Sequence, residues 1–138
     1  MQRAVICEND PDVQKIMSLS LKTYGFECLT PISLEEGLQA INFDDVHIIV
    51  VDENFADENP KNNRIINEIL SFPMYIRREM MFILTGKSLP TMNRLYAFAK
   101  GADLVINTQD LSNFNTIFKR AYAEYQKTYR QFKELLTR

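Results

Sequence analysis

Short, mainly apolar runs alternate along the chain with longer segments of helical period. The runs cover residues 4–7, 26–30, 46–52, 80–85 and 102–107. Between them, apolar side chains recur every three or four residues, as on a helix with one buried face. This alternation is typical of successive βα units around a parallel sheet. We therefore expect a flavodoxin-like α/β fold, a doubly wound five-stranded parallel sheet of order 2-1-3-4-5 with helices on both faces and an extended C-terminal helix.

Capping and breaking residues mark the ends of the expected helices. Asp10 precedes Pro11 and is placed to cap the first helix, which Gly25 ends. Ser33 and Glu36 have the spacing of a capping box at the start of the second. We expect helices over residues 11–24, 34–42, 60–72, 90–100 and 111–137.

Polar side chains follow two of the expected strands. Glu8, Asn9 and Asp10 follow the first strand, and Asp52 ends the third. In a 2-1-3-4-5 sheet these two strands are neighbours, so their carboxyl ends meet at the edge where ligands bind. Grouped carboxylates suit Mg²⁺, and a carboxylate is also a nucleophile towards phosphoryl groups. The alternative for each acidic side chain is a structural role, and Asp10 in particular is placed to cap a helix.

The sequence resembles the receiver domains of two-component response regulators over residues 3–123. Four stretches carry the resemblance, in the same order as in that family: AVICENDPDV, VHIIVVD, MMFILTG and AFAKGADLVIN. The resemblance implies that Asp52 is the phosphoacceptor, that Thr85 is the hydroxyl after the fourth strand, and that Glu8 and Asn9 fall on the acidic pair that holds Mg²⁺. It also implies a protein partner, either a histidine kinase or a downstream effector, and no enzyme activity.

The chain departs from the receiver pattern at positions that matter for phosphorylation. Asn9 replaces a carboxylate, and Thr108 or Asn107 stands where receivers carry a Lys. Lys87, two residues beyond Thr85, is a candidate substitute cation. Losing one charge-assisted contact costs about 1.5 to 3 kcal/mol. We therefore expect a degenerate receiver that binds Mg²⁺ weakly, is phosphorylated weakly or not at all, and acts as a protein-interaction module.

Two alternatives remain open from the sequence. One is an ordinary single-domain response regulator that is phosphorylated at Asp52 with Mg²⁺. The other, more distant, is a small phosphatase with an aspartyl nucleophile, a class that usually carries a second Asp where this chain has Asn54.

The last expected helix carries a seam of apolar and aromatic side chains at steps of four and three. Its members are Phe118, Tyr122, Tyr125, Tyr129, Phe132 and Leu136. We divide the chain into a receiver-like domain, residues 1–123, and a helical extension, residues 124–138, continuous with the last helix. An exposed seam of this kind needs a partner, so we expect association, most simply a homodimer through paired helices. Alternatively, the helix folds back over its own domain or leads into a linker.

Charge is divided unevenly between the body and this helix. Residues 1–110 carry 10 basic and 16 acidic side chains, a net −6, whereas residues 111–138 carry 6 and 2, a net +4. The acidic body argues against a nucleic acid partner, and the opposite charges permit a dimer in which the last helix of one subunit lies across the body of the other. No apolar run has the length of a membrane span or signal segment, so we expect a cytoplasmic protein without membrane association. Cys7, Cys28 and His47 are expected to be scaffold residues without a metal.

Overall fold

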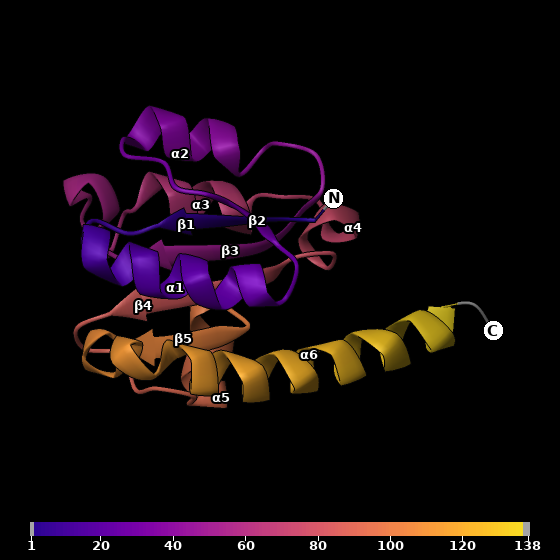
Figure 1. Ribbon diagram of the computed structural model, residues 1–138. Coiled ribbons are helices and arrows are strands. Elements are labelled where there is room, and N and C mark those ends of the chain that lie inside the picture. The colour runs from indigo at the N-terminus through magenta and orange to yellow at the C-terminus, as the bar shows by residue number, and fades with distance from the viewer. Residues whose placement is uncertain (1, 137–138) are drawn as a thin grey trace.

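The computed structural model describes residues 2–136, apart from the side chains of residues 132, 133 and 136. Its centre is a sheet of five parallel strands in the order β2-β1-β3-β4-β5 (Figure 1). The strands are β1 (Arg3–Cys7), β2 (Glu27–Leu29), β3 (Val46–Asp52), β4 (Met81–Gly86) and β5 (Leu104–Asn107). The predicted fold class, strand order and long C-terminal helix are confirmed.

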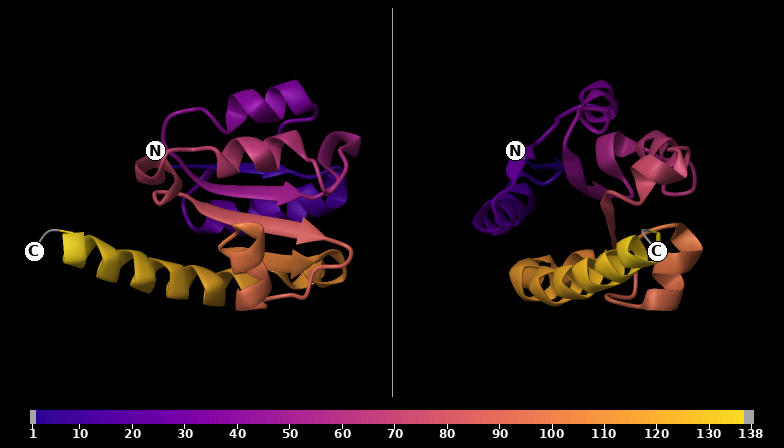
Figure 2. Two further views of the ribbon diagram at one scale, coloured as in Figure 1. Left: turned by 180° about the vertical axis from the view of Figure 1, so that it is seen from behind. Right: turned by 90° about the vertical axis from the view of Figure 1, so that its right-hand side faces the viewer.

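Helices cover both faces of the sheet, as Figures 1 and 2 show. The α-helices are α1 (Pro11–Thr23), α2 (Leu34–Ala40), α3 (Arg64–Leu70), α4 (Met74–Arg77), α5 (Arg94–Lys100) and α6 (Phe114–Leu136), and the 3-10 turns are η1 (Phe55–Asp57) and η2 (Thr108–Asn113). Helices α1 and α6 share one apolar core with the sheet, and α2, α3 and α5 share the other. None of the helices within residues 2–136 is long and apolar enough to cross a membrane.

The central strand β3 contributes to both cores. Ile48 and Val50 pack with the α1 and α6 side, and Ile49 and Val51 pack with the α2 and α3 side. All four are fully buried. Since successive side chains of a strand point to opposite faces, only a strand covered on both sides is continuously apolar, as the sequence of β3 is.

Helices α3 and α5 begin four residues later than the predicted starts, residues 60 and 90, which are both prolines. The side-chain oxygen of Asn63 accepts hydrogen bonds from the backbone N–H groups of Ile65 and Ile66, and Asn63 is buried. Asn93 caps α5 in the same way. An Asn oxygen satisfies the free N–H groups of a first turn, which a proline ring cannot do. The predictions that residues 60 and 90 begin helices were therefore wrong. The short helix α4 was not predicted, and α6 starts at Phe114, after the η2 turn, instead of at Leu111.

The first half of the aromatic seam of α6 lies inside the domain. Phe118 is fully buried. Its ring stacks on Tyr122 and meets Tyr24 edge to face, each with 5.0 Å between ring centroids. The Tyr122 ring also lies 6.0 Å from that of Phe26, again edge to face. These contacts fix α6 against α1 and the edge of the sheet.

Farther along α6, the seam still contacts its own domain. The Tyr125 hydroxyl donates a hydrogen bond to the backbone carbonyl of Arg78 over 3.4 Å, and the Tyr129 hydroxyl donates one to the Glu79 carboxylate. As far as Tyr129, the seam that was expected to pair between subunits is therefore covered within the chain, because the helix lies back along its own body. The last two seam residues, Phe132 and Leu136, lie outside the described side chains.

The docking of α6 predicts that Phe118→Ala lowers the free energy of unfolding by about 3 to 5 kcal/mol, because it leaves a cavity in a closed core. Phe98→Ala is the matched control, since Phe98 is 83% exposed. This control should change stability by about 0.5 kcal/mol or less. Equilibrium denaturation followed by circular dichroism measures both, and equal effects would contradict the docking of α6.

Candidate functional site

The acceptor position lies where β3 and β4 end side by side. Asp52 and Thr85 are register partners in these strands. The Thr85 hydroxyl donates to Oδ2 of Asp52 over 3.4 Å, and the backbone N–H of Asn54 donates to Oδ1 over 2.8 Å. Asp52 is 9% exposed. Burial raises the pKa of its carboxyl, whereas the two hydrogen bonds and the charge of Lys87 act in the opposite direction. Asp52 is thus a buried carboxyl whose charged form is partly stabilised by two hydrogen bonds and by the charge of Lys87.

Glu8 is the second buried carboxyl at this edge. It follows β1, is 8% exposed, and accepts a hydrogen bond through Oε1 from the backbone N–H of Asp10 over 3.2 Å. Its Oε2 is buried and has no hydrogen-bond partner among the described residues. Burial, and then the charge of Asp52, raise the pKa of Glu8 to about 7. Burial and the neighbouring charge thus favour the protonated form of Glu8 more than in an exposed glutamate.

Asn9 joins the loop after β1 to the loop after β3. Its Nδ2 donates to the backbone carbonyl of Asn54 over 2.9 Å, and its Oδ1 accepts from the backbone N–H of Ala56 over 3.0 Å. Ala56 and Asp57 have φ values of 58° and 59°, a left-handed conformation that costs free energy for residues other than glycine. The two hydrogen bonds of Asn9, which we call the Asn9 latch, hold the loop in that conformation.

Asp10 turns away from the acceptor and caps α1. Its Oδ1 accepts from the backbone N–H of Asp12 over 2.9 Å. Asn9 is engaged in the latch and Oδ1 of Asp10 in the cap, whereas Oε2 of Glu8 is buried without a hydrogen-bond partner among the described residues. Among residues 2–136 no group of three or more His, Cys, Asp or Glu side chains could hold a metal ion. Mg²⁺ usually keeps several water ligands and takes only one or two carboxylates from a protein. Glu8 and Asp52 are therefore the residues that would hold it here, and the neutral Asn9 adds no negative charge to the site.

The end of β5 supplies no cation to the acceptor. Asn107 donates through Nδ2 to the backbone carbonyls of Lys87 and Leu89, over 3.1 and 2.9 Å, and so fastens the loop after β4. The hydroxyl of Thr108 is buried and has no partner among the described residues. The positive charge that acts on Asp52 comes from Lys87 on the β4–α5 loop, since it lowers the pKa of that carboxyl.

Glu53 is a third carboxyl at this edge that the sequence analysis missed. It directly follows Asp52, is 8% exposed, and lies against Gly86, where a Cβ atom would come within 2.6 Å of its Oε2. Burial raises its pKa, the charge of Lys100 lowers it, and the charge of Asp52 raises it. Its backbone carbonyl accepts from Nδ2 of Asn63 over 3.0 Å. The only sequence signal was a second acidic residue at the end of the strand.

His47 and Cys28 contact backbone carbonyls, and Cys7 is buried in the sheet. Nδ1 of His47 is 2.9 Å from the backbone carbonyl of Asp45. Cys7 is fully buried in β1, and burial raises the pKa of its thiol to about 12. Cys28 is half-buried, with Sγ 3.7 Å from the carbonyl of Ser18. A thiol with so high a pKa is unreactive at neutral pH.

Solved structures share this arrangement of strands and helices. A CheY-like response regulator receiver domain protein from Methanospirillum hungatei JF-1 superposes with a TM-score of 0.65 over 93% of this chain and 98% of its own, at 18% identity. The chain has the CheY-like receiver fold. The non-phosphorylated HemR receiver domain from Leptospira biflexa gives 0.66 over 88% and 94%, at 16% identity. The BeF3-activated DrrB receiver domain gives 0.64 over 89% and 98%, at 20% identity.

No protein-family model and no curated protein matches the sequence. At identities of 16 to 20%, the likeness to receiver domains extends to the fold. The roles of Asp52, Glu8 and Thr85 in this receiver fold therefore rest on their own geometry.

The buried carboxyls predict that stability falls as pH rises. Folding raises the pKa of Glu8 from 4.5 to about 7, and those of Asp52 and Glu53 shift in the same direction. Between these pH values the folded chain keeps protons that the unfolded chain releases, so the free energy of unfolding decreases with increasing pH. Glu8→Gln should exceed the unmodified chain in stability by about 1 to 2 kcal/mol at about pH 8 and differ little at about pH 4.5.

Urea denaturation at a series of pH values measures this slope. Glu27→Gln is the matched control, because Glu27 is an exposed carboxyl on β2. A Glu8→Gln chain that keeps the pH slope of the unmodified chain would contradict the assignment to Glu8.

Proposed function

We propose that the chain is a two-component receiver domain that is degenerate in its phosphorylation chemistry and acts as a protein-interaction module. In this proposal, Asp52 accepts phosphate weakly or not at all, and the folded domain presents a surface to a protein partner, either a histidine kinase or a downstream effector. The module acts by binding and not by catalysis.

The geometry around Asp52 supports the assignment of the chain as a receiver domain. Asp52 ends the central strand, and the Thr85 hydroxyl lies beside its carboxylate. A carboxylate in this position is a suitable nucleophile for a phosphoryl group, and the neighbouring hydroxyl is a donor for an oxygen of that group.

The Asn9 latch is the observation that carries the degenerate assignment. It engages the Asn54 carbonyl and the Ala56 N–H, so the loop after the acceptor is held by a neutral amide. Phosphorylation would replace the single charge of the Asp52 carboxylate with the larger charge of a phosphoryl group, close to Glu8 and Glu53 and without a cation at the end of β5. Such a product is electrostatically unfavourable, which supports weak phosphorylation.

Helix α5 offers the kind of surface that a protein partner needs. Leu95 and Phe98 lie on it, 81% and 83% exposed. Burial of large exposed apolar side chains by a partner lowers the free energy of the complex. Aromatic residues are also enriched at protein interfaces.

A phosphorylatable regulator is the second candidate, and one observation favours it. The charge of Lys87 lowers the pKa of Asp52. A lysine on the exposed β4–α5 loop that already acts on Asp52 is a candidate cation for an acyl phosphate in place of one at the end of β5.

Labelling by acetyl phosphate, with and without Mg²⁺, separates these two candidates. We expect slow, substoichiometric labelling of the unmodified chain. The double variant Asn9→Asp with Thr108→Lys should be labelled about 10 to 100 times faster in Mg²⁺, because it restores a carboxylate and a fixed cation. Intact-protein mass spectrometry measures the extent of labelling.

Two controls make the labelling result specific. Asp52→Asn should abolish the phosphorylated species. Asn9→Asp with Gln109→Lys adds the same charges but places the cation on the exposed neighbour of Thr108, and should leave the rate near that of Asn9→Asp alone. Rapid, stoichiometric labelling of the unmodified chain would overturn the degenerate assignment in favour of the regulator.

A further inference from the structure

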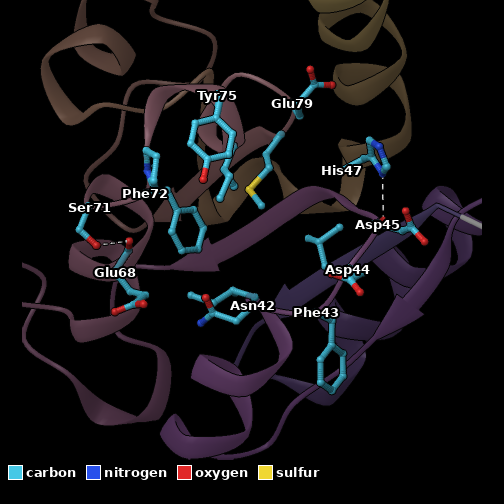
Figure 3. Close-up of a pocket in the computed structure, with 15 residues that line it drawn as sticks. Asn42, Phe43, Asp44, Asp45, His47, Glu68, Ser71, Phe72, Tyr75 and Glu79 are labelled. Carbon is cyan, nitrogen blue, oxygen red and sulfur yellow. Dashed lines mark hydrogen bonds between the residues drawn. The ribbon is translucent and has the colours of Figure 1, made fainter.

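A pocket opens at the end of the molecule opposite the acceptor, at the amino edge of the sheet. It has a volume of about 540 Å³ and lies between the segment that leads into β3 and the segment from α3 to β4 (Figure 3). Aromatic side chains make up much of its wall. Phe43 and Tyr75 are 50% and 65% exposed, and Phe72 lies half-buried between them. None of the acceptor-site residues lines this pocket.

The wall of this pocket is acidic. Four carboxylates line it, Asp44, Asp45, Glu68 and Glu79, and His47 is the one side chain in the lining that can carry a positive charge. Asp44 and Glu68 lie on different sides of the opening (Figure 3). An occupant that fits must therefore combine positive charge with apolar surface.

The end of α6 has both properties and projects from the same edge of the molecule. Beyond Tyr129 the helix runs past the sheet, on the side where the chain begins (Figures 1 and 2). Residues 130–138 include Arg130, Lys133 and Arg138 against one acidic residue, Glu134, a net +2. Leu135 is 65% exposed.

Among the described residues, none of α6 lines the pocket of its own chain. Helix α6 is continuous through Tyr129, whose hydroxyl holds it to the outer carboxylate of Glu79. Beyond this point the helix continues past the sheet, as both views in Figure 2 show. A tail that fits the pocket in charge and apolar character, yet points away from it, can reach the pocket of a second copy.

We propose that the pocket at the amino edge binds the C-terminal tail, residues 130–138, of a second copy of this chain. Because the pocket and the tail lie at the same edge, one two-fold axis places each tail in the partner's pocket, and the interface closes as a dimer. Basic side chains of the tail would lie between the acidic rim and the rings of Phe43 and Tyr75. The chain already shows this kind of contact, since the Arg3 guanidinium lies over the Phe43 ring at 6.0 Å.

Sedimentation velocity of the full chain tests the proposal. We expect dimers at tens of micromolar that weaken with added salt. Leu135→Glu in the tail and Asp44→Lys in the pocket should each raise the dissociation constant about tenfold or more, through lost burial and lost charge pairing. Both side chains are exposed in the single chain, so neither change should unfold the domain.

A charge swap links the tail to the pocket. Arg130→Glu alone should weaken the dimer, and Arg130→Glu combined with Asp44→Lys in one chain should bind more tightly than either single variant, because the partner supplies the opposite charge. Lys15→Glu, an exposed change of the same sign on α1, is the matched control and should leave the dissociation constant within about twofold.

Three results would overturn the proposal. They are a full chain that stays monomeric at hundreds of micromolar, a dimer that Asp44→Lys leaves intact, and a charge swap that binds more weakly than both single variants. A monomer whose pocket binds a basic peptide unrelated to this chain would replace the second copy with another protein partner.

Discussion

Two carboxyl groups are buried side by side at the ends of β1 and β3, and this constraint governs the rest of the site. Glu8 and Asp52 are each less than one-tenth exposed, and the charge of Asp52 helps to raise the pKa of Glu8 to about 7. Burying like charges together is unfavourable unless something neutralises them. In this chain the raised pKa of Glu8 and the hydrogen bonds to Asp52 both act to relieve that repulsion. The Asn9 latch then holds the adjoining loop through backbone groups.

The parallel sheet also determines which features lie at each end of the molecule. Because all five strands are parallel, every strand ends at the acceptor edge and every strand begins at the other. Helix α6 starts beside the acceptor edge and runs back to the amino edge, where the acidic pocket lies. The fold therefore places the acceptor edge and the acidic pocket at opposite ends of the molecule, and α6 spans the distance between them.

The fold could be predicted from the sequence because apolar strand-length runs alternate with segments of helical spacing, a pattern typical of a parallel sheet covered by helices. Strand β3, continuously apolar, was predicted as central and is buried on both faces. The approach of Glu8 to Asp52 followed from the strand order. Side-chain direction did not follow, since Asp10 turns to cap α1 and Asn9 turns to the neighbouring loop. The period of the α6 seam was correct, but period alone does not tell whether the chain's own body or a partner covers a stripe.

We propose that the Asn9 latch and the shared burial of Glu8 and Asp52 leave the acceptor edge with only weak affinity for Mg²⁺. Titration with Mg²⁺, followed by the ¹H–¹⁵N NMR signals of the backbone amides of Asn54 and Ala56, tests it most directly. We expect no saturating shift of these amides up to about 10 mM Mg²⁺, because the neutral Asn9 lowers the negative charge of the site and its amide already engages the loop after β3. Saturation near about 1 mM, with shifts centred on Glu8, Asp52 and Ala56, would contradict it.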